Sequence, residues 1–129
     1  MANILLLITG GAIGTLARYG LSGMMHKFFD GVFPVGTLVV NMTGSFIIGL
    51  LWGFLGEDNI STSMRTFLFI GILGGFTTFS TFTLETLQLF REGEVKMTLI
   101  NILANNILGI LLVIIGFILA RGLFSMLRL

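Results

Sequence analysis

The stretch GGFTTFSTFTLE, residues 74–85, collects aromatic and hydroxyl side chains in an otherwise apolar part of the sequence. Phe79 and Phe82 are three residues apart, so in a helix they project from nearly one face. Hydroxyl and carboxyl groups follow on an adjacent face, at Thr78, Thr81 and Glu85. An aromatic ring has a positive edge, so phenylalanines presented edge-on favour a small anion without a fixed charge that would trap it. Phenylalanines at this spacing also serve as plain packing against core or lipid, and periodicity leaves both interpretations open.

The same stretch is a poor helix former. Two adjacent glycines are followed by hydroxyl, β-branched and aromatic residues from Thr77 to Thr83. We therefore expect a break in the helix. Lipid cannot satisfy the amides and carbonyls that a break frees, so irregular backbone at this depth persists only where it is buried in protein, lines water or binds an ion. A mild kink healed by threonine and serine hydroxyls is the alternative.

Arg18 and Glu85 are the charged residues that lie most clearly inside apolar stretches. Charges are costly in lipid, so we expect these two to face a cavity or each other. Arg18 would form an electropositive vestibule that draws in anions, and Glu85 would end the hydroxyl track by accepting its hydrogen bonds. A position near the membrane interface, within reach of water, is the alternative for both.

The elements that must position these groups are membrane helices. Of 129 residues, 55% are hydrophobic and 10% charged, so polar side chains are too few to cover a water-soluble globule. The charges gather between apolar stretches long enough to cross a hydrocarbon core of about 30 Å as helices. The sequence predicts an all-α integral membrane protein, a single domain over 1–129. Its four spans are expected at roughly 3–27, 35–56, 65–90 and 97–122, the third one broken.

The amino-acid composition excludes several classes of function. The sequence has no cysteine, which removes disulfides and thiolate chemistry, and its one histidine, His26, lies beside Lys27 as an interfacial side chain. A net charge of +1 gives no electrostatic footprint for nucleic acid. No Ser, His and Asp set can converge, so we do not expect an enzyme.

The basic residues give no bias in orientation. Three lie on the side shared by the second loop and the C-terminus, and three on the other: Arg65, Arg121 and Arg128 against Lys27, Arg91 and Lys96. A chain without bias can insert both ways, and two oppositely inserted copies can form a dimer whose two-fold axis lies in the membrane plane.

Three features together resemble the Fluc (CrcB) family of fluoride channels: the string GGFTTFSTF in the third span, GTLVVNMTGS at residues 36–45, and Arg18 near the end of the first span. The resemblance covers essentially the whole chain. It implies a multi-pass protein of the bacterial cell (inner) membrane that passively exports cytoplasmic fluoride. It also implies an antiparallel dual-topology homodimer with two narrow pores.

The resemblance also implies roles for individual residues. Phe79 and Phe82 would line the pores with their ring edges, and Asn41 would donate its amide hydrogens to the ion. Backbone carbonyls of Gly74 and Thr77 from both subunits would hold a structural sodium ion. Fluoride is strongly hydrated, so a pore must replace its water with neutral donors, which the Asn41 amide and the hydroxyls of Ser80 and Thr81 supply. Interhelical hydrogen bonding is the alternative role for Asn41.

In the fourth span, Asn101 and Asn105 are four residues apart and could face the pore. Members of the family often carry tyrosine or serine at corresponding places, so this chain departs from the expected pattern there. The rival function is that of a small multidrug exporter, which is also a four-span protein that forms antiparallel dimers. Proton-coupled drug export of that kind usually uses an acidic residue in the first span, where this chain has Arg18 and no Asp or Glu.

Overall fold

The computed structural model describes residues 1–56 and 59–127, and every element in that part of the chain is helical. Four runs are long and apolar enough to cross a membrane, at Ala2–Phe28, Val35–Leu55, Thr62–Arg91 and Val95–Leu127. This confirms the predicted all-α class with four apolar helices. Arg128, one of the basic residues counted in the sequence analysis, lies outside the described residues.

The first two spans are single helices, α1 (Ala2–Phe28) and α2 (Val35–Leu55), whereas the last two are composite. The third span is built from α3 (Thr62–Arg65), the π-helical η1 (Thr66–Leu73), α4 (Gly74–Phe76) and α5 (Phe79–Arg91). The fourth is built from α6 (Val95–Leu103), the π-helical η2 (Ala104–Leu108) and α7 (Gly109–Leu127). The first, third and fourth helical runs extend beyond the predicted spans, whereas the second ends one residue earlier.

Local signals set the helix ends. Pro34 directly precedes α2, where its fixed φ suits a helix start. Gly56 ends α2 with φ of 62°, and Gly93 turns the chain between α5 and α6 with φ of 81°. The Ser61 hydroxyl caps α3 by accepting a hydrogen bond from the Met64 amide at 3.2 Å.

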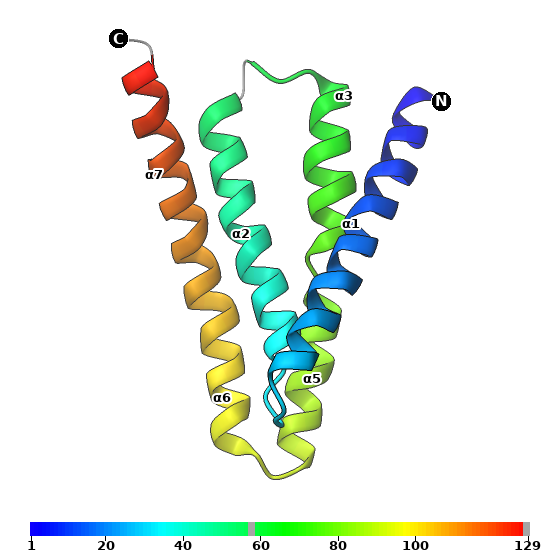
Figure 1. The fold of residues 1–129 in the computed structure, drawn as a ribbon, viewed down its shortest axis with the longest axis vertical. Helices are drawn as coiled ribbons and strands as arrows, with labels where there is room; N and C mark the ends of the chain where they lie inside the picture. Colours follow the sequence, from blue (N-terminus) through cyan, green and yellow to red (C-terminus); the bar gives the residue numbers. More distant parts are fainter. Residues whose placement is uncertain (57–58, 128–129) are drawn as a thin grey trace.

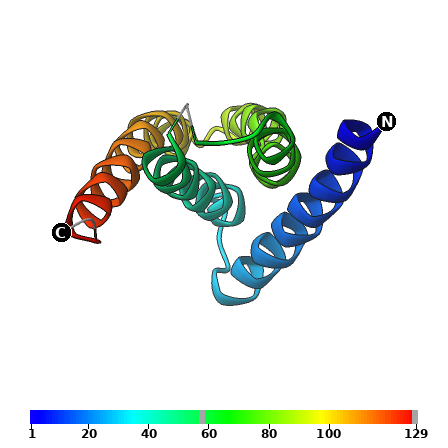
Figure 2. The same ribbon diagram turned by 90° about the horizontal axis from the view of Figure 1, so that it is seen from above.

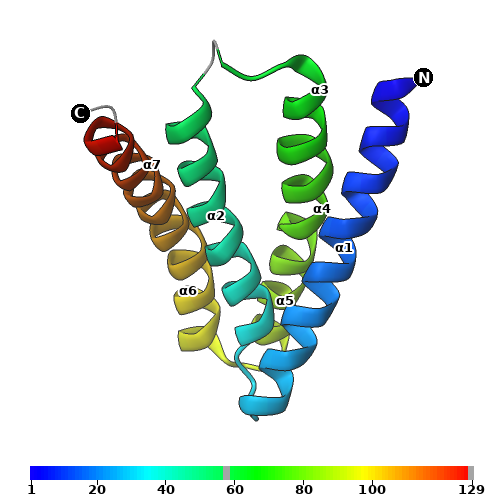
Figure 3. The ribbon, with the colours of Figure 1, turned by 45° about the horizontal axis from the view of Figure 1, so that its top comes forward.

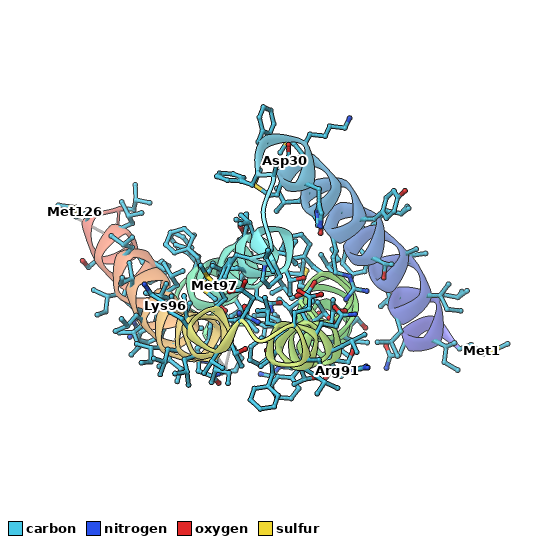
Figure 4. The ribbon with its side chains drawn as sticks, turned by 90° about the horizontal axis from the view of Figure 1, so that it is seen from below. Met1, Asp30, Arg91, Lys96, Met97 and Met126 are labelled. Atoms are coloured by element: carbon cyan, nitrogen blue, oxygen red, sulfur yellow. The ribbon has the colours of Figure 1, made fainter. Side chains whose placement is uncertain are left out.

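The spans run alternately up and down (Figure 1). The N-terminus, the end of α2, the start of α3 and the end of α7 lie at one end, and the short connections after α1 and α5 lie at the other (Figure 1). Seen from that second end, Asp30, Arg91 and Lys96 mark the turns where the chain reverses (Figure 4). Charged residues therefore mark both turns at this end of the bundle.

The helices form two packed pairs. The α1 helix lies along one outer side against η1 and α4, and α7 lies along the opposite side against α2 (Figures 2 and 3). Glycines allow both contacts: a Cβ added to Gly75 would lie 2.8 Å from the Gly11 carbonyl oxygen, and one added to Gly53 would lie 2.6 Å from the Ala120 Cβ. Backbones therefore approach closely in these pairs, as small residues at a contact between membrane helices allow.

Candidate functional site

The third span is broken at Thr77 and Thr78. Both residues are extended, with φ/ψ of −79°/157° and −148°/121°, between the end of α4 and the start of α5. The break lies close to the middle of a 30-residue span. The prediction of a broken helix is confirmed, and the alternative of a mild kink in a continuous helix is wrong.

The break diverts two amides from their helical acceptors. In a continuous α-helix the amides of residues 78 and 81 would donate to the carbonyls of Gly74 and Thr77. Here the Thr78 amide donates to Oδ1 of Asn41 at 2.9 Å, and the Thr81 amide donates to the Thr78 hydroxyl at 3.3 Å. The carbonyls of Gly74 and Thr77, the predicted sodium ligands, are therefore released from helix hydrogen bonding. Arg18 Nη1 donates to the Thr77 carbonyl at 3.4 Å.

Asn41 on α2 holds the broken backbone. Its Oδ1 accepts from the Thr78 amide at 2.9 Å, and its Nδ2 donates to the Thr78 carbonyl at 3.0 Å. One carboxamide thus pairs with both polar backbone groups of one residue, as a neighbouring strand would. Because a backbone N–H can only donate, this pairing also fixes which way the Asn41 amide points.

A second bond extends this contact toward the fourth span. The other hydrogen of Asn41 Nδ2 goes to Asn105 Oδ1 at 3.1 Å. Asn105 Nδ2 donates to both the carbonyl and the side-chain oxygen of Asn101 at 3.0 Å. Asn101 is 1% exposed and donates to the Thr86 hydroxyl at 3.0 Å. Of the two asparagines predicted to face the pore, Asn105 bonds directly to Asn41, whereas Asn101 is buried and reaches Asn41 only through Asn105.

The two predicted pore phenylalanines lie beside this amide group. Their ring centroids are 5.5 Å apart with planes inclined by 59°, and Phe82 is buried whereas Phe79 is 73% exposed in the single subunit. They border a pocket of about 330 Å³, which we call the aromatic pocket. Its lining also includes five other residues of interest: Asn41, Gly74, Thr77, Thr78 and Asn105.

Arg18 and Thr81 belong to a different hollow. They line a pocket of about 460 Å³ between α1, α2 and α5, which we call the arginine pocket. Thr78 lines both this pocket and the aromatic pocket. Its hydroxyl donates to the Thr81 hydroxyl at 3.0 Å. Most of the predicted site residues are thus divided between two hollows that meet at the break. Ser80 lies at the exposed surface of α5.

Glu85 has a different partner from the one expected. Its Oε1 accepts from the hydroxyl of Thr37 on α2 at 2.7 Å. The hydroxyls of Thr78 and Thr81, which were expected to donate to Glu85, are bonded to each other. Glu85 Oε2 is buried with no hydrogen-bond partner in the described part of the chain. It borders a third pocket, of about 200 Å³, together with His26. Glu85 and Arg18 therefore face separate cavities and not each other.

Two polar contacts were missed by the sequence analysis. Thr37 lies four residues before Asn41 on α2, so the pair forms a polar stripe on an apolar helix that could have been found by spacing. Thr86 lies four residues after Phe82, and its hydroxyl donates to the Phe82 carbonyl at 2.7 Å. Threonine hydroxyls commonly donate to a carbonyl of the preceding turn, so this bond gives no signal in the sequence. Only the contact with Asn101 sets Thr86 apart from the other threonines of α5.

Comparisons with known proteins fit this geometry. The family described as CrcB-like protein, Camphor Resistance (CrcB), matches residues 5–117. A protein of Parabacteroides distasonis called fluoride-specific ion channel FluC is 48% identical over 128 residues, which cover 99% of this chain and 100% of that protein. A protein of the same name from Pyrococcus abyssi is 50% identical over 123 residues, covering 94% of this chain and 98% of that one.

A third relative of that name, from Dehalococcoides mccartyi, is 48% identical over 118 residues, with 90% of each chain covered. These names denote ion channels, neither drug exporters nor enzymes. The resemblance stated from the sequence is therefore confirmed, and the chain belongs to the CrcB family.

Proposed function

We propose that this chain is a subunit of a fluoride-specific ion channel. The observation that carries the proposal is the mid-membrane break, whose neutral hydrogen-bonding groups lie beside two phenylalanine rings. Such a site replaces the water around an anion without a fixed positive charge that would retain it. The names of the relatives support the same function.

In this proposal fluoride loses its water in the aromatic pocket. The ring edges of Phe79 and Phe82 face the anion, and Asn41 donates to it. Both hydrogens of Asn41 Nδ2 are engaged, one by the Thr78 carbonyl and one by Asn105. Fluoride must therefore replace Asn105 Oδ1 as the acceptor, since the Thr78 contact is half of a two-bond pairing. Arg18, Ser80 and Thr81 would serve the approach to this point.

The working unit in this proposal is an antiparallel homodimer with two pores. A lone subunit exposes Gly74, Ser80 and Thr81 at membrane depth, where lipid offers no hydrogen-bond partner. A second copy, or water held by it, covers these groups. Basic residues at both ends of the described bundle, Arg65 and Arg121 at one and Lys27, Arg91 and Lys96 at the other, suit insertion in both directions.

A structural sodium ion fits the break. The carbonyls of Gly74 and Thr77, released from helix hydrogen bonding, are hard, neutral oxygen ligands, and Gly74 is exposed on the subunit surface. Arg18, which donates to the Thr77 carbonyl in the single subunit, would have to give up this acceptor to the ion. Two copies would supply four such oxygens. The ion would then bring positive charge that holds the two breaks together.

The proposed setting is the bacterial inner membrane, where the channel would export cytoplasmic fluoride passively. The test uses purified protein in liposomes loaded with potassium fluoride, with valinomycin added to start efflux and a fluoride electrode to follow it. We expect rapid fluoride efflux, little chloride efflux and no need for a proton gradient. Absence of fluoride flux from a well-folded preparation would reject the channel, and flux that required a proton gradient would favour a coupled exporter.

A further inference from the structure

A continuous chain of neutral hydrogen bonds leads from the break to the helix that carries Phe82. It starts at the Thr78 backbone and passes through the carboxamides of Asn41, Asn105 and Asn101, with donor to acceptor distances of 2.9 to 3.1 Å. It then reaches the Thr86 hydroxyl at 3.0 Å and ends on the Phe82 carbonyl at 2.7 Å. The chain thus joins α2, α5 and the fourth span.

The direction of every bond in this amide chain is fixed from its far end. The Phe82 carbonyl can only accept a hydrogen bond, so the Thr86 hydroxyl must donate its hydrogen to it. The Thr86 oxygen is then left as an acceptor for Asn101, which must present its Nδ2. Asn101 Oδ1 in turn requires Asn105 to present Nδ2, which leaves Asn105 Oδ1 facing Asn41.

The same orientation is fixed independently at the near end. The Thr78 amide can only donate, so Asn41 must present Oδ1 to it and Nδ2 to the Thr78 carbonyl and to Asn105. The two ends therefore agree on one arrangement. If Asn105 were turned over, two amide nitrogens would face each other at a part-buried site, which costs free energy because neither donor is satisfied.

We propose that Thr86 and Asn101 are positioning residues for the fluoride pathway. By fixing the orientation of Asn105, they keep its oxygen, the acceptor that fluoride must displace, directed at Asn41. This inference rests on the proposed channel function. It goes beyond that function because it places control of the aromatic pocket at two residues outside its lining: Asn101, buried on the fourth span, and Thr86, one turn past Phe82.

The test compares Thr86→Val with Thr86→Ser in the fluoride efflux assay. Valine keeps the shape and removes the hydroxyl, whereas serine keeps it. Thr86→Val loses one or two hydrogen bonds of the size measured in membrane proteins, which lets Asn105 turn over and set its Nδ2 against that of Asn41. The Asn41 donor is then no longer held in place for fluoride, so we expect efflux slower by about threefold to tenfold. Thr86→Ser should restore the wild-type rate. Thr83→Val is the matched control, because within the described residues the Thr83 hydroxyl bonds only to the Ser80 backbone carbonyl of its own helix, at 2.9 Å.

A double variant separates positioning from a general loss of stability. Asn105→Ala cuts the amide chain between Thr86 and Asn41, so adding Thr86→Val to it should slow efflux no further. Independent structural effects would multiply instead. If Thr86→Val does not give folded protein, Thr86→Cys, which keeps only a weak acceptor, replaces it with a smaller expected loss.

Wild-type rates in Thr86→Val, equal slowing in Thr83→Val, or multiplied effects in the double variant would overturn the inference. If the wild-type protein passed no fluoride, the proposed function itself would fail, and that outcome is distinct from any of these.

Discussion

Removal of the Asn41 side chain tests whether one carboxamide holds the break. Asn41→Ala deletes three hydrogen bonds at once: those from the Thr78 amide, to the Thr78 carbonyl and to Asn105. Thr78 is 9% exposed, so little water can reach its freed backbone groups. Both groups would be left without a partner in the middle of a membrane span.

The expected cost follows from these three bonds. Side-chain hydrogen bonds in membrane proteins average about 0.6 kcal/mol each, which gives about 2 kcal/mol as the lower figure. A buried polar group without a partner costs about 1 to 3 kcal/mol in general. Three groups lose their partner, the Thr78 N–H, the Thr78 C=O and Asn105 Oδ1, so about 2 kcal/mol for each gives an upper figure of about 6 kcal/mol. We therefore expect Asn41→Ala to lower the free energy of unfolding by about 2 to 6 kcal/mol.

Asn106→Ala is the matched control for this measurement. Asn106 is exposed, and in the part of the chain that the structure describes its side-chain amide donates only to the Ile102 carbonyl of its own helix, at 2.7 Å. Its replacement should cost less than about 1 kcal/mol. Both variants are unfolded in mixed micelles with increasing sodium dodecyl sulfate at equal protein concentration, because assembly would otherwise shift the apparent stability. If the two variants unfolded within about 1 kcal/mol of each other, our account of Asn41 as the clamp on the break would be wrong.

Three further substitutions address the pore and the break. Phe82→Ile should slow fluoride efflux at least tenfold while the protein remains folded, since it removes a ring edge from the aromatic pocket; unchanged efflux would remove Phe82 from the pathway. Gly75→Ala should destabilise each subunit by about 1 to 3 kcal/mol, because its new Cβ would lie 2.8 Å from a backbone oxygen of α1, and a normal melting profile would contradict that. Gly74→Ala has room within the subunit, where the nearest atom is 3.7 Å away, so any loss of dimer in size-exclusion chromatography would report on the proposed contact between copies.

The main features of the fold could be predicted from the sequence because each has a local cause. The four apolar helices follow from the spacing of charges, and the break follows from adjacent glycines before a run of weak helix formers around Thr77. The closeness of Phe79 and Phe82 follows from helical spacing. These are properties of neighbouring residues, which a single sequence displays.

The polar partners could not be predicted in the same way. Glu85 was expected to accept from residues on its own helix, but its partner is Thr37 on α2. The link from Asn101 to Thr86 likewise depends on how the third and fourth spans pack. The π-helical turns of η1 and η2 add to the difficulty, because they shift the face that later residues present and follow no spacing rule that we could apply.

Thr78 forms a wall shared by the aromatic pocket and the arginine pocket. Because this residue borders both hollows, a shift of its backbone changes the two linings together. The Asn41 amide, which bonds to both the N–H and the C=O of Thr78, thus holds the shape of both pockets at once.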